Sequence, residues 1–125
     1  VSETTEPIRS LIVTGFPYDR HTRAASYLRP VEAVLERFQG LRRTGSAALD
    51  LCWTAAGRFD GYWEYHLKPW DAAAGALIVE EAGGLLTNVD GQPYDLGATT
   101  FVAGNPTIHK ALLETISSHL PEHLR

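Results

Sequence analysis

The sequence lacks the features that mark membrane, secreted and nucleic-acid-binding proteins. Cys52 is its only cysteine, so no internal disulfide can form and a disulfide-stapled secreted scaffold is excluded. The longest nearly apolar run, residues 72–79, is too short to span a bilayer, and the first residues do not resemble a signal peptide. The formal net charge is −4 and no block of consecutive Lys and Arg occurs. We therefore expect a cytoplasmic protein that binds neither nucleic acid nor membrane.

What remains is the composition of an ordinary globular domain. Hydrophobic residues make up 44% of the 125 residues and charged residues 21%, far from the composition of disordered chains. This length is typical of one domain and leaves little room for two. We therefore predict a single domain over residues 1–125.

Patterns typical of strands and of helices alternate along the chain. Runs rich in β-branched or aromatic residues predict strands at 10–16, 59–66, 85–89 and 100–103, with a short extended piece at 41–45. Apolar residues three and four apart predict helices at 21–38, 46–56 and 69–82, and a last helix that begins at Asn105-Pro106. Pro30 is expected to kink the first helix or to begin a second one. The alternation predicts an α/β fold, with helices layered around a mostly parallel mixed sheet.

The helix start within residues 42–48 has features of an anion-binding site. Gly45 and Ser46 precede the helix, so free backbone N–H groups and the positive end of the helix dipole are expected to point outward. The two arginines before them add guanidinium groups, which suit a carboxylate or a phosphate. Because most Gly-Ser helix starts are only caps, this segment alone does not establish a binding site.

A second helix start carries a carboxylate. Asp71 lies in the first turn of the predicted helix 69–82, where the dipole helps to keep it ionised, and ionised carboxylates are ligands for Mg²⁺. The simpler alternative is that Asp71 only caps its helix. Glu64, at the end of a strand, is either a functional carboxylate or a solvated residue at a rim. The small residues 72–75 would let this helix approach another element closely.

Other catalytic patterns are missing from the sequence. The five histidines have no spacing typical of zinc ligands, and neither a nucleophile elbow nor a P-loop occurs. We expect Asp50 and Asp60 to have structural roles.

Taken in order, four motifs resemble the inositol monophosphatase family. In that family a tryptophan-aspartate pair begins a helix of small residues that ends in Glu-Ala-Gly-Gly, and residues 70–84 read WDAAAGALIVEEAGG. Similar matches occur at residues 43–57 (RTGSAALDLCWTAAG), at residues 14–18 (TGFPY) and at Asn105-Pro106. The resemblance covers nearly the whole chain. It implies the C-terminal half of the sugar-phosphatase fold.

The resemblance also implies roles for individual residues. Asp71 resembles the aspartate that binds the second metal beside the substrate, so we assign it as a metal ligand and a catalytic residue. Glu64 resembles the carboxylate that accepts hydrogen bonds from the inositol hydroxyls. His66 stands where many members have glycine, so the local turn and the substrate rim are expected to differ. The remaining substrate-binding residues implied are Gly45, Ser46 and Ala47 of the loop before the helix, and Arg42 near it.

The function implied is magnesium-dependent hydrolysis of inositol monophosphate, by attack of water on the phosphate with metal assistance. In the family the other metal ligands belong to an N-terminal half, with a Glu-Glu pair and an Asp-Pro-x-Asp-Gly-Thr motif that these 125 residues lack. We therefore expect that this N-terminal half is required as a partner, that the chain alone is inactive, and that the complete enzyme is a homodimer. An apolar face left open for that half would make the isolated chain self-associate.

Two alternatives to this function remain open. The same fold could act on a bisphosphate nucleotide, fructose bisphosphate or histidinol phosphate, although Glu64 favours a polyol ring. Alternatively, the chain could be a non-catalytic, stand-alone binding module, because the N-terminal metal ligands are missing.

Overall fold

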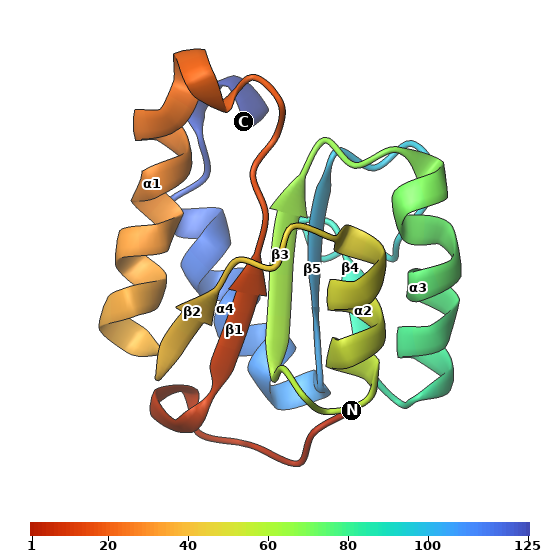
Figure 1. Ribbon diagram of the computed structural model, residues 1–125. Coiled ribbons are helices and arrows are strands. Elements are labelled where there is room, and N and C mark those ends of the chain that lie inside the picture. Colours follow the sequence, from red (N-terminus) through yellow and green to blue (C-terminus); the bar gives the residue numbers. More distant parts are fainter.

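The computed structural model describes residues 1–125 and contains four α-helices, five strands and two short 3-10 helices (Figure 1). In chain order these are η1 (Pro7–Arg9), β1 (Leu11–Thr14), α1 (Arg20–Arg37), β2 (Gly40–Arg42), α2 (Ala47–Ala55), β3 (Gly61–Tyr65), α3 (Pro69–Glu81), β4 (Leu85–Thr87), β5 (Thr100–Gly104), α4 (Pro106–Ser118) and η2 (Glu122–Leu124). Every predicted strand and helix is present, with its ends shifted by a few residues. None of the helices is both long enough and apolar enough to cross a bilayer.

The five strands form one sheet in the order β2-β1-β3-β5-β4. β1 pairs in parallel with β2 and β3, whereas β5 runs antiparallel to β3 and β4. The predicted α/β fold with a mixed sheet is confirmed, and the parallel pairing is confined to β1, β2 and β3. The carboxyl ends of these three strands meet at one edge of the sheet, which is the place where open α/β sheets bind ligands.

Helices cover both faces of the sheet, with α2 and α3 on one face and α1 and α4 on the other (Figure 1). Successive residues of a strand point to opposite faces, so the central strands contribute to two separate cores. Ile12, Trp63 and Val102 belong to the core beneath α1 and α4, whereas Val13, Tyr62 and Phe101 belong to the core beneath α2 and α3. This two-sided burial explains the apolar character of β1 and β5 in the sequence.

α3 approaches α2 closely at Gly75. A Cβ atom at this position would lie 2.6 Å from the Cβ of Leu51, so no larger residue fits without moving a helix. The predicted close approach of the small residues 72–75 is therefore confirmed at Gly75. Ala73 and Ala74 face away from α2 and are exposed.

α1 is kinked at Arg23, where φ is −127° and ψ is 18°, and not at Pro30. The prediction that Pro30 kinks or begins a helix is therefore wrong. Proline has no N–H to donate to the carbonyl one turn earlier, but Pro30 is buried against the rest of the protein. The apolar contacts of its ring offset the missing hydrogen bond within a continuous helix.

Candidate active site

A cavity of about 390 Å³ opens where β1, β2 and β3 end, at the upper edge of the sheet in Figure 1. Its walls come from the segments that follow these strands, within residues 15–20, 43–50 and 64–71. The parallel arrangement of the three strands therefore brings together segments that are far apart in the sequence. Both helix starts singled out in the sequence lie in these walls.

One wall is the start of α2. Ser46 is the N-cap residue, and its side-chain oxygen accepts a hydrogen bond from the backbone N–H of Leu49 at 3.3 Å. Gly45 precedes it with a φ of +94°, a conformation that glycine adopts without strain. Gly45, Ser46 and Ala47 all line the cavity. Because backbone N–H groups of the first turn have no partner inside a helix, this wall suits an anion.

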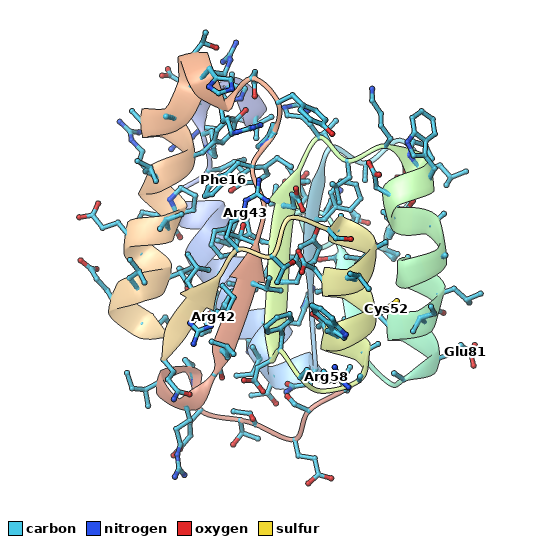
Figure 2. The ribbon with its side chains drawn as sticks, in the orientation of Figure 1. Phe16, Arg42, Arg43, Cys52, Arg58 and Glu81 are labelled. Carbon is cyan, nitrogen blue, oxygen red and sulfur yellow. The ribbon has the colours of Figure 1, made fainter.

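Arg43 lines the cavity, whereas Arg42 does not. The Cζ atom of Arg43 lies 5.9 Å from the centroid of the Phe16 ring, and Figure 2 shows the two side chains together near the strand ends. Arg42 is exposed farther down β2, and its Nη1 donates to the carbonyl of Leu41 at 3.0 Å. Successive residues of an extended segment point in opposite directions, so only one of the two arginines can face the cavity. The predicted contact of Arg42 with substrate therefore has no support in this geometry.

A second wall is the start of α3, where Asp71 combines the two roles considered for it. Its Oδ2 accepts a hydrogen bond from the backbone N–H of Lys68 at 2.9 Å, so the carboxylate caps its own helix. Asp71 also lines the cavity, and its other oxygen, Oδ1, makes no hydrogen bond. That oxygen is free to bind a cation, while the capping bond holds the carboxylate in place.

Glu64 lies deep in the cavity wall and is only 9% exposed, so it is not a solvated rim residue. The Tyr62 hydroxyl donates to Oε2 of Glu64 at 2.6 Å, and any side chain at Gly15 would collide with the carboxylate. Burial raises the pKa of Glu64 to about 7, against the effect of the Tyr62 bond, and nearby Asp50 and Asp71 raise it further. Glu64 therefore changes its protonation state near neutral pH.

Sequence reasoning missed Gly15 and Tyr62 as parts of this arrangement. Tyr62 stands two residues before Glu64 on β3, and residues two apart on a strand lie on the same face. Gly15 follows β1, which is the parallel neighbour of β3. The two-residue spacing between Tyr62 and Glu64 could have indicated their contact from the sequence. The contact of Gly15 with Glu64 could not be predicted without knowing that β1 pairs with β3.

Asp50 was also missed, because it was expected to have only a structural role. Asp50 lines the cavity although it is only 1% exposed. Its Oδ1 accepts a hydrogen bond from the Thr44 hydroxyl. Its Oδ2 is buried and has no hydrogen-bond partner. Burial raises the pKa of Asp50, while the Thr44 bond and the charge of Arg43 oppose that effect. Asp50 thus ties the loop before α2 to the helix itself.

His66 lies at the rim of the cavity in a left-handed conformation, with a φ of +56°. The turn between β3 and α3 was expected to differ because His66 stands where many family members have glycine. The backbone of His66 has a conformation that glycine favours, so this turn is one that a glycine could also form.

The carboxylates fit a magnesium ion only in part. Asp50, Glu64 and Asp71 offer oxygen atoms, which are the ligands that Mg²⁺ prefers. No three Asp, Glu, His or Cys side chains come together in a group that could hold a metal ion. Of the three carboxylates, Asp71 is the one that is partly exposed, and one of its oxygens is free; a complete site needs ligands beyond those of this cavity.

The sequence model of one family, described as the inositol monophosphatase family, matches residues 1–124. The chain belongs to the inositol monophosphatase family. The resemblance noted from the ordered motifs is therefore confirmed.

Individual relatives agree with the family assignment. The Nus factor SuhB of Pseudomonas aeruginosa is 44% identical over 118 residues, which cover 93% of this chain and 44% of that protein. The inositol-1-monophosphatase of Synechocystis is 43% identical over 118 residues, which cover 94% of this chain and 41% of that protein. The solved structure of inositol monophosphatase from Anabaena has a TM-score of 0.89 at 41% identity, over 100% of this chain and 50% of that one. The chain thus spans half the length of these family members or less.

Proposed function

We propose that this chain forms the substrate side of a magnesium-dependent phosphomonoesterase that hydrolyses inositol monophosphate. The proposal rests on one observation: three features line the same cavity in a member of the inositol monophosphatase family. These are the anion-binding start of α2, the buried carboxylate of Glu64 and the carboxylate of Asp71 with one free oxygen.

The substrate would be held by two chemically different walls. Phosphate oxygens would accept hydrogen bonds from the backbone N–H groups at Ser46 and Ala47, next to the guanidinium group of Arg43. Ring hydroxyls would donate to Glu64, whose Oε2 is already fixed by Tyr62. A carboxylate ionises more readily when donors approach it, so a bound polyol would favour the charged form of Glu64.

Asp71 would supply a magnesium ligand through Oδ1, while Oδ2 keeps its bond to the Lys68 N–H. Bound magnesium would lower the pKa of a water molecule and screen the charge of the phosphoryl oxygens. Because Asp71 and the start of α2 line the same cavity, the phosphate and the cation would then lie close together. Further ligands are required, and we propose that they come from an N-terminal half with the acidic motifs of the family.

The outer face of α2 and α3 offers a surface for that half. α3 has apolar residues on all sides, a pattern typical of a helix that is covered all round. Leu49 of α2 and Leu77 and Ile78 of α3 are exposed, and Leu77 reaches 59%. We propose that the N-terminal half covers this face, that the isolated chain self-associates through it, and that the complete enzyme is a homodimer. A stable monodisperse monomer on a sizing column would contradict the self-association.

The test is magnesium-dependent phosphate release from inositol monophosphate. The chain is assayed alone and mixed with the N-terminal half of the Anabaena relative, with Asp71→Asn as the control. Activity in the mixture alone, lost in Asp71→Asn, supports a site divided between two halves. Activity of the chain alone that depends on Asp71 would contradict the need for outside ligands. Relative turnover of fructose bisphosphate, histidinol phosphate and a bisphosphate nucleotide tests the choice of substrate.

A non-catalytic role is the second candidate. It is favoured by the name of the Pseudomonas aeruginosa relative, which is called a Nus factor. An inert mixture with every ester, although the two halves form a stable complex, would favour this candidate.

A further inference from the structure

The backbone at His66 departs from the strand that precedes it. Successive residues of a strand point to opposite faces, and Tyr65 belongs to the core beneath α1 and α4. His66 does not continue this alternation, because its backbone is left-handed, with a φ of +56°. This conformation is uncommon for a residue with a Cβ atom, and it persists where the surrounding structure holds the residue in place.

Four aromatic rings form a row that joins the end of β3 to α1 and η2. The rings of Tyr65 and Tyr27 stack with centroids 5.9 Å apart, and the ring of His123 meets Tyr27 edge-on at 5.6 Å. The fourth ring is that of His66, which stacks on His123 with centroids 6.3 Å apart and 15° between the planes. Tyr65 and His66, adjacent in the sequence, are therefore the two ends of one row.

The middle of this row is fixed by burial and by hydrogen bonds. Tyr27 is only 2% exposed, and its hydroxyl donates to Oδ1 of Asp19 at 2.7 Å. That bond lowers the pKa of Asp19, so the carboxylate is ionised at neutral pH and can only accept. The Tyr27 hydroxyl therefore accepts from Nε2–H of His123, which lies 3.2 Å away. This bond ties η2 to α1 and sets the place of the His123 ring.

The turn that follows His66 leads directly to the cap of α3. The N–H of Lys68 donates to Oδ2 of Asp71 at 2.9 Å, and the N–H of Asp71 donates to the Lys68 carbonyl at 2.9 Å. Pro69 restricts the residue before it to an extended backbone, and Lys68 has a φ of −84° and a ψ of 156°. Only Leu67 separates Lys68 from His66, so a displacement of His66 is transmitted to the Lys68 N–H.

We propose that His123 is a positioning residue, which holds the turn at residues 66–68 through its contact with the His66 ring. The turn then presents the Lys68 N–H to Asp71, and this bond fixes the orientation of the carboxylate. The use of that orientation for a magnesium ion rests on the proposed function, whereas the contact between the rings does not. The C-terminal segment thereby supports a carboxylate that belongs to another element.

Hydrogen exchange at the Lys68 N–H of the 125-residue chain tests the inference, because this proton is bonded to the Asp71 carboxylate. His123→Ala is expected to speed its exchange about tenfold. The His66 N–H is bonded to the Thr99 carbonyl at 2.7 Å and is expected to exchange as in the wild-type chain. His123→Phe keeps an aromatic ring between its two neighbours and is expected to restore most of the protection.

A second substitution tests whether His123 acts through the ring of His66. His66→Asn removes the ring, and asparagine tolerates the left-handed backbone. It is expected to speed exchange at Lys68 as much as His123→Ala does, and the double variant is expected to be no faster than either single variant. His119→Ala is the matched control, because His119 lies in the same C-terminal segment but bonds to the Thr115 carbonyl.

The inference is overturned if His123→Ala leaves exchange at Lys68 unchanged, or if His119→Ala speeds it equally. Additive effects of His66→Asn and His123→Ala would also overturn it, as would equal acceleration at the His66 N–H, which indicates a general loss of packing. These measurements need neither magnesium nor turnover. An inert mixture of the two halves would therefore refute the proposed phosphatase and leave the role of His123 standing.

Discussion

Two helices begin at the same cavity, and their starts are built for ligands of opposite charge. At α2 the cap is the neutral hydroxyl of Ser46, so the positive end of the helix dipole remains available to an anion. At α3 the cap is the carboxylate of Asp71, which accepts the Lys68 N–H and brings a full negative charge to the helix start. The positive end of a helix dipole is therefore present at both starts, next to an anion site at α2 and next to a candidate cation ligand at α3.

The residue that begins each helix strengthens this difference. Ala47 is the first residue of α2 and has an N–H group, whereas α3 begins with Pro69, which has none. The start of α3 thus has one donor fewer to offer an anion. The choice of cap and of first residue, and not the helix itself, decides which charge each wall accepts.

The largest effect is expected from a substitution that removes the candidate cation ligand at the start of α3. Asp71→Asn keeps an oxygen that can accept the Lys68 N–H but removes the charge needed by a magnesium ligand. In the mixture with an N-terminal half, we expect phosphate release to fall by roughly a thousandfold while stability changes by less than about 0.5 kcal/mol. Urea unfolding and steady-state turnover of the same preparation separate the two effects. A loss of stability as large as the loss of activity would show that Asp71 acts mainly as a cap.

The next effect concerns Glu64, which lies between the two helix starts. Its pKa is raised to about 7 in the folded protein, so the folded state keeps a proton that the unfolded chain releases above about pH 4.3. Glu64 is therefore expected to lower the free energy of unfolding between about pH 4.3 and pH 7, in total by about 4 kcal/mol. Burial lowers the pKa of His109, which contributes a slope of the opposite sign. Urea unfolding across this window measures the slope.

Glu64→Gln is the matched control, because it cannot ionise and should remove most of that slope. Burial also raises the pKa of Asp50, which leaves a slope of the same sign. Asp71→Asn should lower the pKa of Glu64, because the negative charge of Asp71 contributes to raising it. Parallel stability curves for the wild-type chain and Glu64→Gln would refute the assignment.

How far the sequence predicts such a site depends on whether a feature is local. The Ser46 cap and the first-turn position of Asp71 follow from residues close together in the chain, and the structure contains both. The strands and helices follow from periodicity in the same way. The depth of Glu64 and Asp50 could not be predicted, because it is set by the packing of α2 and by the pairing of β1 with β3.

The arginines show the same limit on a smaller scale. Arg42 and Arg43 are adjacent and chemically identical, and the strand end decides which of them faces the cavity. Shifting the end of β2 by one residue would exchange them. Pro30 failed as a signal for a related reason, since its buried surroundings override its local preference.

The third prediction concerns a substitution that gives the start of α2 a carboxylate cap like that of α3. Ser46→Asp keeps a side-chain oxygen that can cap α2 but places a negative charge at the phosphate position. We expect stability to change little and the affinity for inositol monophosphate in magnesium buffer to fall about tenfold to a hundredfold. Ser46→Asn, an uncharged cap of the same shape, should retain most of the affinity. Equal losses in both variants would mean that shape, and not charge, matters at this helix start.

The smallest effect compares the two caps as hydrogen bonds. Ser46→Ala removes a neutral bond of 3.3 Å, whereas Asp71→Ala removes a charge-assisted bond of 2.9 Å. We expect losses of about 0.5 kcal/mol and about 1 kcal/mol of unfolding free energy, respectively. The measurement belongs at about pH 5, where Glu64 is protonated and its repulsion of Asp71 does not offset the lost cap. A larger loss for Ser46→Ala would reverse the ranking and place the stronger cap at the anion site.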